Sequence, residues 1–232
     1  MIPAELIQRA RREGRAALDE RSGKALLAAY GIAVPRGALV AGAGEAKTSL
    51  DGVRPPYVVK VVSPDILHKS DVGGVRVGLK SADEVAEAIV AMMQQPVIAN
   101  SRIDGFLVEE MAPPGQEMVI GGLRDPDFGP LVMVGLGGIF VEVLADVAFR
   151  ICPITALDAE EMLSELKGAA LLEGARGRPP LAKSAIVEAL LKIGGDDGLL
   201  LRHAAEIKEA DVNPLIVSER GAVAVDARFV LG

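Results

Sequence analysis

The chain has 232 residues, 50% of them hydrophobic, and a formal net charge of -7 at pH 7. This length and composition can supply the core of one large domain or of two small ones. The acidic balance argues against binding to nucleic acid or to an anionic membrane, because proteins of both kinds carry clustered Lys and Arg.

The single cysteine and the N-terminal segment indicate the cellular location that we expect for the chain. Cys152 is the only cysteine, so an intrachain disulfide is impossible and a zinc site is unexpected; we expect a buried small hydrophobe. The N-terminal segment mixes acidic and basic residues and has no apolar secretory core. No stretch reaches the ~18 uncharged apolar residues that a membrane-spanning helix needs. We therefore expect the protein in the cytoplasm.

The first half of the chain is predicted to form two helices followed by a strand-rich segment. Apolar residues recur with helical spacing over residues 4–20, which predicts an amphipathic helix. A second helix is expected from Ser22, as its cap, to Tyr30, where Gly31 ends it. The elements predicted next are strands at residues 38–40, 57–62, 75–79 and 106–110, and a helix at residues 83–93 after the candidate cap Ser81.

The second half mixes strands and helices in the same way. Its predicted strands are residues 118–123, 131–136, 147–151, 215–217 and 222–225, and its predicted helices are residues 158–167 and 183–193. Strand pairs joined by short turns, intermixed with helices, indicate antiparallel α+β lobes. Residues 174–180 are predicted to form a mobile loop, in which Arg176 and Arg178 reach phosphate or a partner chain, or else an exposed linker.

The segment of residues 58–75 carries residue types suited to phosphate chemistry. Lys60 lies in a Val-rich strand, and a buried ammonium group is costly without an anion, so it predicts a phosphate ligand; the alternative is a strand-edge lysine whose amine reaches water. His68 follows on a polar loop, where a neutral imidazole can attack phosphorus; the alternative is a structural or phosphate-binding histidine. Gly73 and Gly74 could direct peptide N–H groups toward phosphates, or form an ordinary turn.

Carboxylates lie on either side of a tight connection at residues 113–115. Glu109, Glu110 and Met111 end one apolar run, and Glu117 precedes the next. Ionised carboxylates only accept hydrogen bonds, whereas adenine amino and ribose hydroxyl groups donate them. One carboxylate could therefore bind the base and the other the ribose.

Asp211, Asn213 and Asp226 form a candidate metal site near the C-terminus. Side chains alternate along a strand, so Asp211 and Asn213 are expected to share a face. Asp226 is expected on the apolar strand that follows, and a hairpin could bring it beside them. Such an all-oxygen set suits Mg2+ that bridges nucleotide phosphates. Taken singly, each acidic residue is more typical of a solvated turn or sheet edge.

Together these segments resemble the ATP-grasp (beta) subunit of NDP-forming acyl-CoA synthetases, the ADP-forming acetyl-CoA synthetases that are related to succinyl-CoA synthetase. The resemblance lies in residues 60–75, 124–130, 135–142 and 211–215, in the family's order, and extends from about Ser22 to Leu231. It implies an α+β, ATP-grasp fold over residues 1–232, with nucleotide bound between two lobes. The lobes implied are about residues 22–111 and 112–232, after an N-terminal helix at residues 1–21.

The resemblance also implies a function: the nucleotide-handling part of acyl-CoA + ADP + phosphate ⇌ carboxylic acid + CoA + ATP. His68 matches the family histidine that relays the phosphoryl group between a second histidine, on the alpha subunit, and ADP. No dinucleotide-type glycine motif is present, so a separate CoA-binding alpha subunit is implied, in a hetero-oligomer. The residues expected to bind ATP or ADP are Lys60, Gly73, Gly74, Glu109, Glu110, Met111, Glu117 and Arg124, and those expected to bind Mg2+ are Asp211, Asn213 and Asp226.

Several other residues have two interpretations. Arg150 is a second candidate phosphate cation, and Glu142 matches a family motif in which it either binds metal or holds the loop. The pair Gly137 and Gly138 either approaches phosphate or forms an ordinary turn. His203 lies beside an apolar run and is predicted to be structural. The loop at residues 174–180 departs from the family, because no acidic residue follows it closely.

A second class of function is a non-catalytic regulatory or assembly module, like the acyl-CoA-synthetase-like region of some protein acetyltransferases. The joint presence of Lys60, His68, Glu117, Asn213 and Asp226 favours the enzyme, because a module that only binds nucleotide needs no histidine. The same histidine argues against a self-sufficient ATP-grasp ligase that makes an acyl phosphate.

Overall fold

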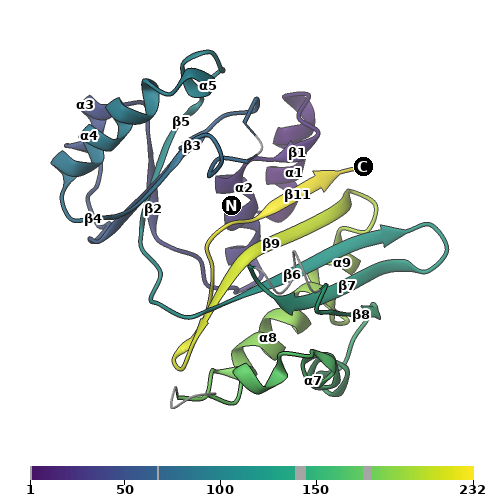
Figure 1. The fold of residues 1–232 in the computed structure, drawn as a ribbon. Helices are drawn as coiled ribbons and strands as arrows, with labels where there is room; N and C mark the ends of the chain where they lie inside the picture. Colours follow the sequence, from purple (N-terminus) through teal and green to yellow (C-terminus); the bar gives the residue numbers. More distant parts are fainter. Residues whose placement is uncertain (1, 67, 139–144, 175–178) are drawn as a thin grey trace. The chain divides into compact units, whose positions relative to one another are not determined.

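The computed structural model describes residues 2–66, 68–138, 145–174 and 179–232 and divides the chain into two compact units (Figure 1). The smaller unit is Pro35–Ala112, and the larger unit combines Met1–Val34 with Pro113–Gly232. The sequence predicts residues 22–34 in the first lobe, whereas they pack with the C-terminal part of the chain. The predicted boundary between residues 111 and 112 lies next to the observed one, between Ala112 and Pro113.

The smaller unit is a four-stranded antiparallel sheet with helices packed on one face. Its strands follow the order β2 (Gly37–Val40), β5 (Gly105–Glu110), β3 (Tyr57–Val62) and β4 (Val75–Leu79). Its helices are α3 (Ala43–Ala46), α4 (Ala82–Met93) and α5 (Pro96–Ala99). The predicted cap Ser81 is confirmed, because its hydroxyl accepts a hydrogen bond from the Glu84 amide at 3.2 Å.

Strand β3 presents its side chains alternately to the two faces of this sheet. Val59 and Val61 are fully buried in the core formed with the helices. Lys60 lies between them in sequence, so its side chain points to the opposite face. The register pairs Lys60 with Leu107 and Val58 with Glu109. Lys60 and Glu109 are therefore diagonal neighbours on the face away from the core.

The larger unit contains a seven-stranded sheet. The strands along its main path are β1 (Ala17–Leu18), β11 (Arg228–Leu231), β9 (Ile207–Ser218), β6 (Gln116–Asp125), β7 (Gly129–Leu136) and β8 (Val147–Ile151), and β10 (Gly221–Ala224) pairs with β9 outside this path. Every pairing is antiparallel. The longest strands, β9 and β6, lie side by side at its centre, and they carry Asp211, Asn213, Glu117 and Arg124.

One face of this sheet packs against helices and forms the main core. The helices are α1 (Pro3–Arg12), α2 (Glu20–Ala29), α7 (Ala156–Glu165), α8 (Lys183–Gly194) and α9 (Leu199–Arg202), with a 3-10 turn at Ala169–Leu171. Met118 and Ile120 of β6 point into this core. Gly121 and Asp211, which pair across β6 and β9, line a pocket of about 330 Å3 on the other face.

The helix predicted over residues 4–20 is shorter than expected. It ends at Arg12, because Gly14 has φ +68 and turns the chain. Ala17 and Leu18 then form the two-residue strand β1, which pairs with Val230 and Phe229 of β11. Their apolar spacing suits a helix as well as a strand, and only the pairing with the distant C-terminus decides between the two.

Two predictions close to the candidate metal site also need correction. Helix α2 begins at Glu20, and its cap is Asp19, whose carboxylate accepts from the Ser22 amide at 2.8 Å. Ser22 is therefore inside the helix rather than its cap. Asp226 was expected on an apolar strand, but it lies after the end of β10 in the connection to β11.

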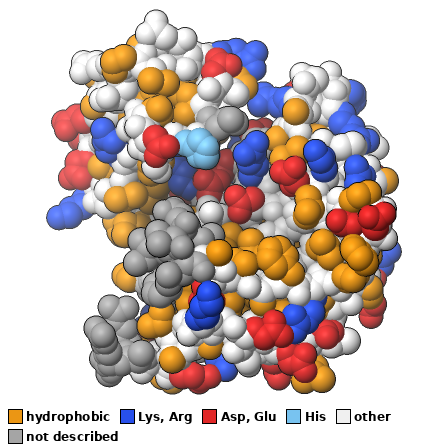
Figure 2. Space-filling model, turned by 45° about the vertical axis from the view of Figure 1, so that its right-hand side comes forward, with side chains coloured by type: hydrophobic (Ala, Val, Ile, Leu, Met, Phe, Trp, Pro, Cys, Tyr) orange, Lys and Arg blue, Asp and Glu red, His pale blue; other side chains and the backbone are white. Residues whose placement is uncertain are grey.

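Cys152 is confirmed as a buried residue with a free thiol. Burial raises the pKa of the Cys152 thiol to about 11, so at neutral pH it is an uncharged apolar side chain. Among the helices of the described residues, none has both the length and the apolar character that crossing a membrane requires. On the face shown in Figure 2, acidic and basic side chains are interspersed with hydrophobic ones rather than gathered by sign.

Candidate active site

Lys60 and Glu109 form a buried ion pair in the smaller unit. The Lys60 Nζ lies 3.3 Å from Glu109 Oε2, and the two residues are 7% and 3% exposed. Strand β3 lies between β5 and β4, so the alternative of a strand-edge lysine reaching water is wrong. The predicted phosphate ligand and the predicted base ligand thus meet on one face of the sheet.

Glu110 and Met111 follow Glu109 in the chain, at the C-terminal end of β5. The Glu110 and Met111 amides donate to the Arg36 and Pro56 carbonyls, both at 2.8 Å. The Glu110 carboxylate accepts from the Arg54 amide at 3.1 Å. Because both backbone N–H groups are used within the unit, any backbone contact with a nucleotide base would have to come from a carbonyl oxygen.

His68 lies on an exposed segment between β3 and β4. The turn that follows is closed by the Gly73 amide, which donates to Ser70 at 3.2 Å, and by the Gly74 amide, which donates to Lys69 at 2.7 Å. Gly73 has φ +70, and a Cβ at Gly74 would lie 2.6 Å from Val61 Cγ1. Glycine is thus required by the turn itself. In this conformation the two N–H groups do not face outward, so the structure does not support their predicted contact with phosphate.

Asp211, Asn213 and Asp226 converge in the larger unit. Asp211 and Asn213 are exposed residues of β9. The backbone N–H of Asn213 donates a hydrogen bond to the backbone carbonyl of Asp226 at 3.3 Å. Lost hydration raises the pKa of the Asp211 carboxyl group, the nearby Asp226 charge raises it further, and Arg228 opposes both. Two carboxylates whose charges interact, with the Asn213 side chain on the same face of β9 as Asp211, offer the oxygen ligands that a hard divalent cation takes.

The described residues contain no group of three or more His, Cys, Asp or Glu placed to hold a metal ion. A metal at Asp211, Asn213 and Asp226 would therefore need the Asn213 amide oxygen and oxygens from water or phosphate to complete its ligands. Mg2+ is bound in this way, by one or two carboxylates with waters and substrate phosphates. The residues present fit that ion better than Zn2+, which prefers Cys and His.

Glu117 lies on β6 against the predicted glycine turn. The Gly137 amide donates to the Glu117 carbonyl at 2.7 Å, and a Cβ on Gly137 would lie 2.8 Å from the Cβ of Glu117. Gly138 has φ +65, and the Glu117 Oε2 is 3.9 Å from where its Cβ would be. The glycine pair therefore gives the Glu117 side chain room to lie over the turn. Glu142, in the same family motif, lies outside the described residues.

Arg124 does not lie with the other candidate residues of the larger unit. Alternation along β6 places Arg124 on the opposite face from Glu117 and Gly121. Its Nη1 donates to the Ala204 carbonyl at 2.8 Å, behind the sheet. This contact accounts for the arginine without a nucleotide, and nothing in this arrangement supports its predicted binding to phosphate.

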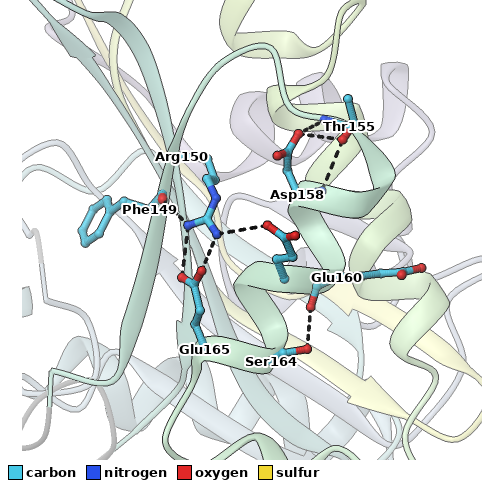
Figure 3. A network of polar contacts seen from close by, with 8 residues as sticks. Phe149, Arg150, Thr155, Asp158, Glu160, Ser164 and Glu165 are labelled. Atoms are coloured by element: carbon cyan, nitrogen blue, oxygen red, sulfur yellow. Dashed lines mark hydrogen bonds and ion pairs between the residues drawn. The ribbon is translucent and has the colours of Figure 1, made fainter.

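Arg150 is bound to helix α7 (Figure 3). Its guanidinium group contacts both carboxylate oxygens of Glu165, one of them at 3.1 Å, and it lies 3.7 Å from Glu161. The hydrogen bond to Glu165 raises the pKa of Arg150, and burial opposes this shift. The arginine thus joins β8 to α7, and these contacts do not support the alternative of a phosphate cation. Arg176 and Arg178 lie outside the described residues.

His203, which the sequence predicts to be structural, packs against an aromatic ring. Its ring meets that of Tyr30 edge to face, with centroids 6.0 Å apart. Its buried Nε2 has no hydrogen-bond partner in the described part of the chain. Burial lowers the pKa of His203, and the charge of Glu206 partly opposes this.

Besides the pairing of Lys60 with Glu109, the sequence did not reveal a buried ion pair between Glu20 and Lys24 of α2, whose Oε1 and Nζ are 2.7 Å apart. The signal for it was present, since a glutamate four residues before a lysine favours pairing on a helix. That pattern is common on exposed helices, so it does not predict burial.

Comparison with known proteins places this geometry in a family. The protein-family model described as an ATP-grasp domain matches residues 9–231 of the chain. The chain belongs to the ATP-grasp family. The predicted ATP-grasp fold is thereby confirmed. Within the family the chain is 43% identical, over 229 residues, to the beta subunit of acetate–CoA ligase (ADP-forming) I from Pyrococcus furiosus, covering 98% of this chain and 97% of that protein.

Other ATP-grasp relatives are longer or structurally known. Acetate–CoA ligase (ADP-forming) I of Archaeoglobus fulgidus is 43% identical over 211 residues, but the match spans only 30% of its length. A solved chain of the acetyl-coenzyme A synthetase 1 of Ca. Korarchaeum cryptofilum, in complex with coenzyme A and Ca-AMPCP, superposes with a TM-score of 0.92 at 42% identity and 100% coverage of both chains. Another structure of that enzyme, with coenzyme A and Mg-AMPPCP, has a phosphohistidine segment pointing towards the nucleotide-binding site; it covers 100% of both chains at 41% identity and TM-score 0.86.

Proposed function

We propose that this chain is the nucleotide-binding beta subunit of an ADP-forming acyl-CoA synthetase. The reaction is acyl-CoA + ADP + phosphate ⇌ carboxylic acid + CoA + ATP, and this chain carries out the transfer between a phosphohistidine and ADP. The observation that carries the proposal is the match to a beta subunit of this class at 43% identity over almost the full length of both chains.

His68 is the proposed phosphoryl carrier. A nucleophile that receives a group from another subunit must be accessible, and His68 is exposed. Its neutral ring nitrogen attacks the phosphorus carried by the phosphohistidine of the alpha subunit; a new P–N bond forms at His68 while the P–N bond to the donor histidine breaks and the donor nitrogen keeps the electron pair. An ADP β-phosphate oxygen then attacks the same phosphorus, the P–N bond breaks, and the ring nitrogen recovers its electron pair as ATP forms. Transfer of the phosphoryl group by His68 also distinguishes this function from that of a regulatory module, because a module that only binds nucleotide needs no histidine.

Nucleotide and metal are assigned to the residues already described. Lys60 would meet phosphate, Glu109 with the backbone at Glu110 and Met111 would meet the base, and Glu117 would accept from ribose hydroxyls. Asp211, Asn213 and Asp226 would hold Mg2+. When bound there, such an ion would neutralise and orient the phosphate oxygens. Arg124, Gly73 and Gly74 are left out of this assignment because of the contacts they make.

A CoA-binding alpha subunit is the proposed partner in a hetero-oligomer. The relative that matches end to end is named a beta subunit, and this chain corresponds to about a third of a relative that is a single long chain, at 30% of its length. The acyl and CoA chemistry would then take place on the remaining part, supplied here by a separate polypeptide. A cytoplasmic location is part of the same proposal, because CoA and ADP are cytoplasmic substrates.

The test replaces each of the two histidines in turn. His68→Asn keeps approximate size and polarity but removes the nucleophile, so with the alpha subunit, acyl-CoA and labelled phosphate present it should form no ATP and retain ADP affinity. His203→Asn is the matched control and should keep phosphoryl transfer. If His68→Asn retained even a tenth of the wild-type ATP formation, the phosphoryl group would reach ADP by another route and the proposal would be wrong.

A further inference from the structure

We infer that helix α2 positions Asp226 for metal binding, through the buried pair of Glu20 and Lys24 and through Gly23. The inference rests on the proposed function, because it concerns the metal site assigned to Asp211, Asn213 and Asp226. It adds a helix from the N-terminal segment to a site whose ligands all come from the C-terminal strands.

The Glu20–Lys24 pair is unusual for its burial. Lys24 is 4% exposed and Glu20 is 6% exposed, and Nζ lies 2.7 Å from Oε1. The same helix buries Leu26 and Leu27 completely, so it is anchored by apolar contacts without the pair. Removing two charges from water is costly, and apolar residues of similar volume commonly give equal or greater stability. A role in orienting neighbouring groups explains the pair better than stability does.

The contacts of α2 reach the backbone on both sides of Asp226. Lys24 Nζ donates to the Val225 carbonyl at 3.5 Å, immediately before Asp226. A Cβ at Gly23 would lie 2.8 Å from the Ala227 carbonyl oxygen, immediately after it. Glycine lets the helix approach this closely, and the lysine charge is directed at the carbonyl on the other side. Helix α2 therefore defines the path of the chain at Asp226.

The opposite side of the same segment is held by strand β9. The Val225 amide donates to the Pro214 carbonyl at 3.0 Å, and the Asn213 amide donates to the Asp226 carbonyl at 3.3 Å. The Ala227 amide donates to Asp226 Oδ1 at 2.8 Å and orients the carboxylate. The segment from Val225 to Ala227 thus lies between α2 and β9, and its distance from Asn213 depends on both.

Metal binding is sensitive to this kind of support. Ligand distances are fixed to within about 0.2 Å, so a displaced backbone removes a carboxylate from the coordination sphere. Loss of an outer contact that orients a ligand typically lowers metal affinity by roughly 10- to 100-fold. Lys24, Glu20 and Gly23 are positioning residues in this sense, since they act on the metal through Asp226.

Helix α8 provides a matched control. Lys192 pairs with Glu188, at the same spacing as in α2, and donates to the Gly31 carbonyl at 2.7 Å. It is therefore also a lysine that joins a glutamate one turn away to a backbone carbonyl. The carbonyl it contacts belongs to Gly31, just beyond the C-terminal end of α2, and not to either chain neighbour of Asp226. Replacing Lys192 tests whether any disturbance near α2 is enough to weaken metal binding.

The experiment measures ADP affinity of the full chain by calorimetry, with Mg2+ and with EDTA, and takes the ratio as the enhancement by magnesium. Lys24→Met and Gly23→Ala should each lower this enhancement roughly tenfold, while ADP affinity in EDTA stays at the wild-type value. Lys192→Met should keep the wild-type enhancement. Gly23→Ala adds only one methyl group, so it decides the question if Lys24→Met does not fold.

Two results measured on the variants would overturn the inference. The first is folded Lys24→Met or Gly23→Ala protein with the wild-type enhancement by magnesium. The second is an equal loss of ADP affinity with and without Mg2+, which would show a general structural role.

The wild-type chain distinguishes failure of this inference from failure of the proposed function. If it binds ADP without any enhancement by Mg2+, the metal assignment is refuted, and the positioning role with it. If it binds no ADP, the proposed function itself is refuted.

Discussion

The Lys60 Nζ lies 3.3 Å from the Glu109 carboxylate, on neighbouring strands β3 and β5, and both side chains are buried. Sequence reasoning assigns one residue to phosphate and the other to the base, whereas the fold makes them partners. A buried cation is tolerated when a carboxylate lies beside it. The proposed phosphate binding at Lys60 and the proposed base binding at Glu109 would therefore be coupled, because any ligand that contacts one side chain changes the environment of the other.

Breaking this pair should destabilise the smaller unit. Glu109→Gln is expected to lower the free energy of unfolding by about 3 kcal/mol, because it leaves a buried lysine facing a neutral amide. Urea denaturation measures the change. Lys47→Met, which breaks the exposed ion pair with Asp83, is the control and should alter stability little. The double variant Lys60→Met/Glu109→Leu should recover most of the stability but not ADP affinity; a Glu109→Gln loss no larger than the control's would contradict the coupling.

Asn213 should matter for nucleotide binding only when Mg2+ is present. Asn213→Ala removes an amide oxygen from the proposed donor set, so it should weaken ADP binding roughly tenfold or more with Mg2+ and leave it unchanged in EDTA. Calorimetry measures both affinities. Asn100→Ala, at an exposed amide that donates to the Pro96 carbonyl at 2.7 Å, is the control and should have no effect on either. Equal wild-type affinity with and without Mg2+ would remove the metal assignment.

Acidification should destabilise the larger unit through His203. Burial lowers the pKa of His203 in the folded chain, so the unfolded chain binds the proton first. Stability should therefore fall as pH drops from about 7 through the ordinary histidine value near 6.5 and on toward the lowered folded value. His203→Phe keeps an aromatic ring against Tyr30 and should flatten this part of the pH dependence of the denaturation midpoint. His68→Asn should retain it; a slope that persisted in His203→Phe would assign it to other groups.

Helix α7 should depend on its N-terminal cap. The Thr155 hydroxyl accepts from the Asp158 amide at 3.2 Å, and the Asp158 carboxylate accepts from the Thr155 amide at 2.7 Å (Figure 3). Thr155→Ala should lower the free energy of unfolding by about 1 kcal/mol, and Thr155→Ser should keep most of it. Thermal denaturation of the two variants measures this. Hydrogen bonds from Thr155 lower the pKa of Asp158, so the capping contribution should be present at neutral pH and disappear as pH falls through that lowered value.

The parts of the fold that could be predicted are those written in local patterns. The β-branched run of β3 and the serine at the start of α4 indicate their structures within a few residues. The error at residues 4–20 has a non-local cause, since Ala17 and Leu18 become a strand only by pairing with β11.

The candidate site shows the same limit. Asp211 and Asn213 could be placed on one face from strand alternation alone, and both are exposed on β9. Arg124 could not, because the strand predicted at residues 118–123 includes neither Glu117 nor Arg124, whereas the observed strand β6 contains both. The contact between α2 and the Asp226 segment joins parts of the chain separated by almost its entire length, and no local signal marks it.

Strand β1 has its own consequence for how the protein is made. It pairs with β11, so the sheet of the larger unit joins Leu18 to Phe229, two residues that are far apart along the chain. Long-range pairing of this kind is slow, and it must wait until the last strand has left the ribosome. The smaller unit, by contrast, is one continuous segment that can fold during synthesis. While translation continues, the apolar faces of α1 and α2 therefore remain without their final partners, and this is the interval in which the nascent chain is most exposed to aggregation.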